Sequence, residues 1–155
     1  MTFNCLSMQF IPVKEYLEEN ETFAADSGLR ESLIMSVDFY KRVGFNPPWI
    51  CYYASVNEEL VGCAGYKGKP IDGIVEIAYG TFEKFRNRGF GTEICRRLVE
   101  LSIQTDPTLL ITARTLPENN FSTRILRKNQ FQFSTELTDP EDGQLWEWIY
   151  KGFLV

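Results

Sequence analysis

Histidine is missing from this sequence of 155 residues. Its absence excludes nucleophilic catalysis by Ser-His-Asp or Cys-His groups and argues against a zinc site, because imidazole is the usual base in the first and a frequent ligand in the second. The four cysteines, at positions 5, 51, 63 and 95, form no CxxC pair, and three of them lie within apolar patterns. We therefore expect free thiols in a reducing compartment, the cytoplasm, and no metal.

Long apolar runs and an excess of positive charge are also absent. No stretch approaches the roughly 20 apolar residues of a membrane span, and the first residues lack the basic and apolar regions of a signal peptide. The net charge of −5 argues against binding to nucleic acid through its phosphates. An acidic surface would tolerate a cationic acceptor, although mild acidity also serves solubility alone. The length suits one domain over residues 1–155, with 44% hydrophobic residues to form its core.

The patterns along the chain predict an α+β domain, with a mixed, mainly antiparallel sheet flanked by helices. Ser27 is the predicted N-cap of the second helix, and Gly44 is expected to end that helix with a left-handed backbone. The strand–helix–strand unit within 74–115 should place its two strands parallel. Strands are expected at about 5–13, 49–56, 60–66, 74–82, 109–115, 131–136 and 144–150, and helices at about 13–21, 27–42, 91–103 and 119–129.

Chemistry is indicated most clearly by the segment that joins the strand 74–82 to the helix 91–103. Gly89 and Gly91 would let the backbone approach a ligand closely. The free N–H groups of the first helical turn and the helix dipole favour a phosphate or diphosphate, and two arginines add positive charge. The segment reads Arg86-Asn87-Arg88-Gly89-Phe90-Gly91-Thr92.

Other glycine motifs fit this segment less well. Ile94 occupies the position where a dinucleotide fingerprint needs a third small residue, and no Gly-Lys-Ser/Thr triplet of a P-loop exists. A plain glycine-rich turn that begins a helix is the structural alternative to a ligand site.

The spacing Arg86-x-x-Gly89-x-Gly91 after a strand resembles the acetyl-CoA signature of the GNAT N-acetyltransferase superfamily. Other stretches are similar to the branch that includes the ribosomal-protein N-acetyltransferases, and the similarity covers about residues 49 to 150 in order and spacing. It implies an acyl-CoA N-acyltransferase fold, and transfer of an acetyl group from acetyl-CoA to a primary amine by direct attack. The stretches that resemble the ribosomal-protein N-acetyltransferase branch are Gly65–Pro70, Asp72-Gly73, Val75–Gly80, Thr112–Asn119, Ser122, Leu126–Lys128 and Trp146–Trp148.

The resemblance also implies where acetyl-CoA would lie. The molecule would occupy a V between the strands 74–82 and 109–115, with its pantetheine arm paired to backbone groups near Thr81 and Phe82. Amides from Arg86 through Thr92 would bind the diphosphate, and the Thr92 hydroxyl would be a further donor. Asn119 corresponds to a family asparagine near the pantetheine; its alternative is an ordinary helix N-cap.

Two residues are candidate catalysts. Glu76 lies in the strand beside the expected thioester and could act as a weak base through water, although a structural, solvent-facing glutamate fits the pattern equally. Strand alternation leaves open which face of the sheet meets the acceptor. The tyrosine that serves many relatives as acid corresponds here to Leu126. Ser122, one turn earlier, is therefore the candidate donor, and its alternative is a first-turn residue that satisfies backbone groups.

The acceptor itself is left open by the sequence. A small molecule or a protein N-terminus would both supply the amine, in a pocket built by the N-terminal helices, the turn near 67–73 and the last hairpin. Dimers are common among similar proteins. The missing tyrosine and histidine motivate an alternative, a non-catalytic acyl-CoA-binding or regulatory domain, and an unrelated nucleotide-binding module is a third possibility.

Overall fold

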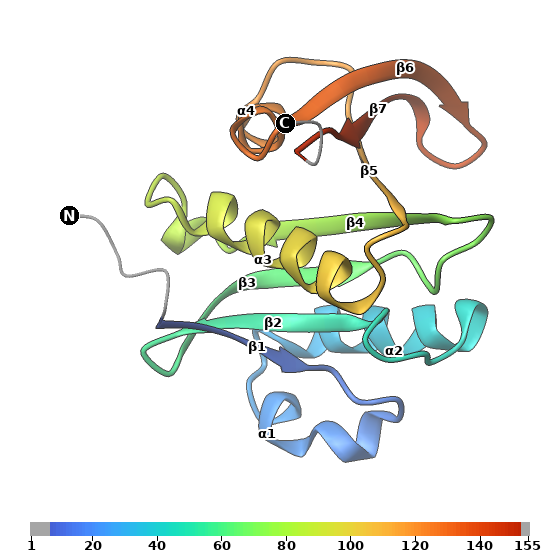
Figure 1. The fold of residues 1–155 in the computed structure, drawn as a ribbon. Helices are drawn as coiled ribbons and strands as arrows, with labels where there is room; N and C mark the ends of the chain where they lie inside the picture. The colour runs from blue at the N-terminus through green and yellow to red at the C-terminus, as the bar shows by residue number, and fades with distance from the viewer. Residues whose placement is uncertain (1–6, 153–155) are drawn as a thin grey trace.

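The computed structural model describes residues 7–152. These residues form a seven-stranded sheet in the order β1-β2-β3-β4-β5-β7-β6, with helices on both faces (Figure 1). Neighbouring strands are antiparallel except for β4 and β5, which run parallel. The predicted fold class, a mixed and mainly antiparallel sheet flanked by helices, is therefore confirmed, as is the parallel pair.

The observed elements match most of the predicted ones within a few residues. The strands are β1 (Met8–Pro12), β2 (Cys51–Val56), β3 (Glu59–Tyr66), β4 (Ile74–Thr81), β5 (Leu110–Thr115), β6 (Phe131–Asp139) and β7 (Gly143–Tyr150). The α-helices are α1 (Glu21–Ala24), α2 (Arg30–Val43), α3 (Phe90–Thr105) and α4 (Phe121–Lys128), with 3-10 turns η2 (Leu17–Asn20) and η3 (Glu83–Phe85). Positions 5 and 6 of the first predicted strand lie outside the described residues.

The single helix predicted at 13–21 is wrong. The chain there forms η2 and the short α1, and residues 13–16 are not helical. The side chain of Asn20 accepts the N–H of Lys14 at 2.8 Å and donates to the carbonyl of Tyr16 at 2.9 Å. These bonds give the backbone an alternative to helical hydrogen bonding. The polar sequence pattern alone therefore predicted a helix that does not form at residues 13–16.

The predicted ends of α2 need two corrections. Leu29, not Ser27, occupies the N-cap position, because the carboxylate of Asp26 accepts the N–H of Gly28 at 2.8 Å and holds a turn ahead of the helix. Gly44 ends the helix with a positive φ of 92°, but its ψ of 170° lies outside the left-handed helical region.

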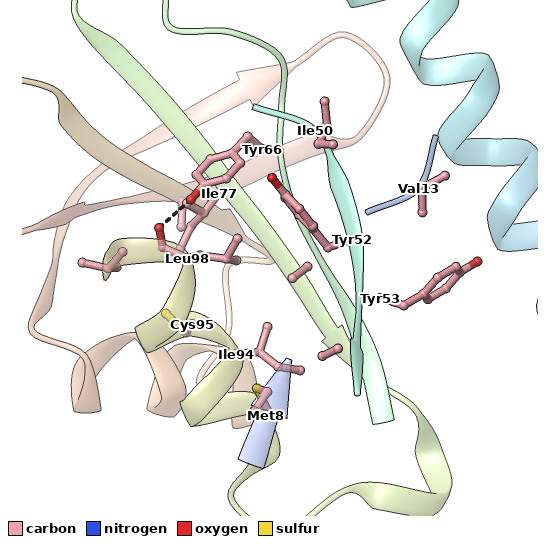
Figure 2. Close-up of a cluster of buried hydrophobic side chains, with 14 of the residues drawn as sticks. Met8, Val13, Ile50, Tyr52, Tyr53, Tyr66, Ile77, Ile94, Cys95 and Leu98 are labelled. Atoms are coloured by element: carbon pink, nitrogen blue, oxygen red, sulfur yellow. Dashed lines mark hydrogen bonds between the residues drawn. The ribbon is translucent and has the colours of Figure 1, made fainter. Parts of the chain in front are cut away.

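The core lies on both faces of β2, β3 and β4, with α3 on one face and α2 on the other (Figure 1). The Tyr66 hydroxyl reaches the α3 side and donates to the Leu98 carbonyl at 2.6 Å (Figure 2). Tyr53 points to the opposite face, where its hydroxyl lies 2.7 Å from that of Ser32 on α2. Because side chains alternate between the two faces along each strand, the sheet packs against one helical layer on each face.

The feature that positions the site is the separation of β4 from β5. The two strands pair from Ile74 opposite Leu110 to Ile77 opposite Ala113, and the pairing then stops. Beyond that point β4 stays with β3, while β5 stays with β7 as far as Thr115. Figure 1 shows β5 turning away from β4. The lining residues of a cleft include residues of both strands beyond the last paired residues.

Candidate active site

The opening between β4 and β5 is a cleft of about 1070 Å³. Small-molecule sites typically have about 300–1,000 Å³, so this cleft has room for an extended cofactor arm together with a second ligand. It is lined by α2 on one face of the sheet and by α4 on the other, so it passes through the sheet. Other lining residues come from β2, β3, the split ends of β4 and β5, and the turn between β6 and β7.

The loop from β4 to α3 has the geometry expected of an anion site. Gly89 is the N-cap of α3 with a φ of 84°, and it offers no side chain to cap the first turn. Residues 86–89 are all exposed, so a ligand can reach this end of the helix. Arg86 bridges towards α4, because its Nε lies 3.4 Å from the Thr81 carbonyl and its guanidinium lies 5.2 Å from the centre of the Phe121 ring.

The reason for glycine at position 91 differs from the one predicted. Gly91 is buried, and a Cβ there would lie 2.7 Å from Cδ1 of Ile125 and 3.0 Å from Oγ1 of Thr81. Glycine is therefore needed where α3 packs against α4 and β4. The ligand-approach argument holds for the exposed Gly89 and not for the side of Gly91 that faces α4.

The predicted pairing of a pantetheine arm to Phe82 is not supported by the backbone. The Phe82 N–H donates to the Val61 carbonyl at 2.9 Å, and its carbonyl accepts the N–H of Phe85 at 2.8 Å. Because strand residues alternate between the two neighbours, Tyr79 and Thr81 are the residues whose backbone groups face the opening. The Thr81 part of the prediction is kept, and Tyr79 replaces Phe82.

Glu76 lies in the wall of the cleft, with 22% of its side chain exposed. Its Oε1 is 3.5 Å from Nε of Arg114 on β5. Burial raises the pKa of Glu76, Arg114 and Lys67 offset part of this rise, and Glu147 and Asp139 add to it. A carboxylate whose pKa is shifted towards neutrality inside a cleft is suited to accept a proton, whereas the solvent-facing alternative does not describe its position.

Ser122 also lines the cleft, in the first turn of α4. Its hydroxyl has no hydrogen-bond partner among the described residues, so the alternative role of satisfying backbone groups is not observed. The Tyr79 hydroxyl donates to the Ser122 carbonyl at 3.2 Å and joins β4 to α4 across the opening. Leu126, which was expected to correspond to a family tyrosine, is fully buried and also lines the cleft.

Sequence reasoning gave no role to Tyr79, although its hydroxyl reaches α4 inside the cleft. Burial raises the pKa of Tyr79 strongly, and a smaller contribution comes from Cys95, so the hydroxyl keeps its proton. Strand alternation put Tyr79 on the opposite face from Glu76, but only the position of α4 shows what the ring meets.

Asn119 does not cap α4, so that alternative is wrong. Asn120 is the N-cap, and its side chain accepts the N–H of Thr123 at 3.1 Å. Asn119 is exposed, and its Oδ1 accepts a hydrogen bond of 3.2 Å from Arg127. Its proposed place beside the pantetheine stays a prediction.

The described cysteines are free thiols. Cys51 and Cys63 are half-buried in the cleft wall and Cys95 is buried. Burial raises the pKa of all three, that of Cys63 to about 11, so they are poor nucleophiles. Between residues 7 and 152, no three side chains of metal-binding type are grouped to hold an ion, and no helix is long and apolar enough to cross a bilayer.

Two parallel strands that part beside an exposed helix start form the arrangement of the GNAT acetyltransferases. Residues 7–132 match the family model described as the acetyltransferase (GNAT) domain, and the chain belongs to this family. The uncharacterized N-acetyltransferase YjdG of Bacillus subtilis (strain 168) is 28% identical over 95 residues, which is 61% of this chain and 54% of YjdG. The match thus spans about half the length of that relative.

Solved structures share the fold across nearly the whole chain. RimL, a ribosomal L7/L12 alpha-N-protein acetyltransferase in complex with coenzyme A, is 12% identical with a TM-score of 0.67, over 92% of this chain and 93% of RimL. AAC(6′)-Ib in complex with paromomycin and acetyl-CoA is 20% identical with a TM-score of 0.64, over 94% of this chain and 92% of that protein. At such identities the likeness shows the fold alone.

Proposed function

We propose that this protein transfers an acetyl group from acetyl-CoA to a primary amine. The observation that carries the proposal is the parting of β4 from β5 beyond Ile77 and Ala113. It opens a cleft with Glu76 in its wall, next to the strand end that leads into the exposed N-terminus of α3. The solved relatives that hold coenzyme A or acetyl-CoA share this fold.

In this proposal the diphosphate of acetyl-CoA lies on the amides of residues 86–92, with Arg86 and Arg88 nearby. Each charge-assisted hydrogen bond contributes roughly 1.5–3 kcal/mol, so three or four would hold the diphosphate after the cost of association. The pantetheine arm follows the backbone of Tyr79 and Thr81 into the cleft, with Asn119 beside it. The thioester then lies between Glu76 and Ser122.

The reaction needs a neutral amine. At pH 7 a lysine-like amine must gain about 4.5 kcal/mol to lose its proton, whereas an α-amine needs only about 1 kcal/mol. Glu76, with its raised pKa, suits the second case and takes the amine proton directly or through water. A bond forms between the amine nitrogen and the thioester carbon, the carbon–sulfur bond breaks, and the electron pair leaves on sulfur.

The departing thiolate needs a hydrogen-bond donor more than a strong acid, because the reference pKa of a thiol is only about 8.5. Ser122 supplies a hydroxyl without a competing partner among the described residues, whereas the Tyr79 hydroxyl donates its proton to the Ser122 carbonyl. The raised pKa of Tyr79 means that its hydroxyl keeps its proton, and it would donate to the thiolate only by turning away from this carbonyl. The absence of the family tyrosine therefore does not remove every donor from the cleft.

The test is thiol release from acetyl-CoA by the full chain with a panel of amines, together with the mass of each product. The panel includes peptides with a free N-terminus, the same peptides with a blocked N-terminus and one lysine, and small amines. We expect turnover that favours α-amines. Tight binding of acetyl-CoA without turnover of any amine would instead support an acyl-CoA-binding or regulatory domain. Preference for ATP or NAD over coenzyme A in thermal shift would exclude both readings.

A further inference from the structure

The half of the cleft that faces α2 is lined by charged side chains of both signs. Arg42 on α2 and Lys67 after β3 contribute positive charge on one side. Arg114 also faces the cleft, and the acidic residues Glu76, Asp139, Glu141 and Asp142 line it from β4 and from the β6–β7 turn. Opposite charges at two sides of one pocket favour a ligand that is itself dipolar.

The two cations of the positive side lie against one aromatic ring, and Lys67 also acts on the acidic side over a longer distance, because it lowers the pKa of both Glu76 and Asp139. The Arg42 guanidinium lies 5.4 Å and the Lys67 ammonium 5.9 Å from the centre of the same Phe39 ring. Neither cation forms an ion pair with any described residue. Lys67 is the neighbour of Glu76 across β3 and β4, since its N–H donates to the Glu76 carbonyl at 2.9 Å, yet its ammonium lies against Phe39.

The acidic side is arranged differently, because Arg114 already pairs with two of its carboxylates. Arg114 lies 3.5 Å from Glu76 and 3.5 Å from Asp139. Asp139 also accepts the backbone N–H groups of Glu141 and Asp142 at 2.8 and 3.0 Å, which fixes the turn. Glu141 and Asp142 are exposed at the rim and form no ion pair among the described residues. An amine would be attracted along this side towards Glu76.

We propose that the acceptor is a zwitterion, a primary amine that also carries a carboxylate or a phosphate. The anionic group lies between Arg42 and Lys67 against the edge of Phe39, and the amine lies at Glu76. This inference rests on the proposed acetyl transfer and names the substrate class for it. The chemistry fits a free amino acid and equally a protein N-terminus followed by an acidic residue.

The test compares acceptors in pairs that differ in the anionic group. The pairs are L-alanine and alaninamide, O-phosphoethanolamine and ethanolamine, and Ser-Asp and Ser-Asn peptides, with rates calculated per concentration of neutral amine. We expect kcat/KM to be on the order of 10- to 100-fold higher for the anionic member, as one or two charged hydrogen bonds would give. A preference confined to the peptides identifies a protein N-terminus as the source, and one confined to the small pairs identifies a metabolite.

The variants Arg42→Gln and Lys67→Gln should remove this preference by raising KM for the anionic acceptors, and Arg42→Lys should restore part of it. The matched control is Lys41→Gln, because Lys41 is the neighbour of Arg42 on α2 and pairs with Asp38 outside the cleft. Unchanged Tm and acetyl-CoA affinity would show that the variants are folded. Equal turnover within each pair would overturn the zwitterion proposal and leave acetyl transfer intact. No turnover of any amine would overturn both.

Discussion

The end of the cleft assigned to acetyl-CoA and the end assigned to the acceptor are built from the chain in different ways. The first uses one continuous stretch, β4 through the start of α3, and acts mainly through backbone groups. The second collects side chains from α2, β3, β4, β5 and the β6–β7 turn. Binding by backbone depends on local geometry, whereas the acceptor end depends on how distant segments meet.

This comparison predicts that the backbone end fails most severely when its geometry is altered. Gly89→Glu places a side chain at a φ of 84° and brings negative charge to the expected diphosphate site. We expect the Kd for acetyl-CoA, measured by calorimetry, to rise at least about 100-fold, because two or more charge-assisted hydrogen bonds are lost.

The matched control is Gly73→Glu, where φ is 76° and no atom lies near the position of the added Cβ. Both variants place the same charged side chain at a similar positive φ, so the main difference is the place. If both lost acetyl-CoA binding equally, the exposed start of α3 would not be the diphosphate site.

The second largest effect is expected at the centre of the cleft. Glu76→Gln removes the base and should lower kcat by about 10²- to 10⁴-fold, with little change in the Kd for acetyl-CoA. Because burial raises the pKa of Glu76, the rate of the native protein should rise with pH through a midpoint above 4.5, and this acidic limb should vanish in the variant. Glu136→Gln, at an exposed position of β6, should retain the native profile.

A smaller effect is expected for the thiolate donor. Ser122→Ala should reduce kcat by roughly ten- to 100-fold, since a hydrogen bond to the charged thiolate contributes roughly 1.5–3 kcal/mol. The double variant Ser122→Ala with Tyr79→Phe should lose more than the product of the single effects if the two hydroxyls substitute for each other. Strictly multiplicative losses would assign them independent roles.

The smallest effect on activity is expected at Glu93, in the first turn of α3, because this residue does not line the cleft. The Glu93 carboxylate lies 2.8 Å from Arg96 and 3.0 Å from Arg97. Burial favours a higher pKa for Glu93, but hydrogen bonds from Arg96 and Arg97 outweigh it, so the pKa is lowered. Its stabilising contribution is therefore present above the unfolded pKa of 4.5 and is lost as the pH falls through the folded value.

Glu93→Gln should therefore lower the free energy of unfolding by about 1 kcal/mol at pH 7, because both arginines are partly exposed to solvent. The difference from the native protein should shrink in acid, as urea unfolding at several pH values would show, while kcat stays the same. A loss of kcat comparable to that of Glu76→Gln would mean that Glu93 takes part in the chemistry.

The contrast between a site built from one continuous segment and a site built from distant segments also explains what the sequence could predict. The succession of strands and helices along the chain, the parallel pair and a helix that begins near position 91 follow from local patterns, and the structure confirms them within a few residues for most elements. The buried reason for Gly91, the engaged backbone of Phe82 and the position of Tyr79 depend on contacts with α4 and β3. No pattern along one segment contains such contacts, so these details could not be predicted.

The acceptor pocket was predicted only as a set of segments. Of those segments, α2, Lys67 and the last hairpin line the cleft, whereas α1 and residues 68–73 do not. The pairing of Arg114 with Glu76 and Asp139 became visible only in three dimensions. The N-cap of α4 shows a similar limit at short range. Asn119 and Asn120 carry the same side chain, and only the hydrogen bond to Thr123 decides between them.

A passage lined from both faces of the sheet has two mouths. Because α2 borders one mouth and α4 the other, a thioester and an amine could approach from opposite directions and be held together without either blocking the other. Enzymes of this geometry have no need to store the acyl group on a side chain between two half-reactions. Steady-state plots with both concentrations varied would then intersect rather than run parallel.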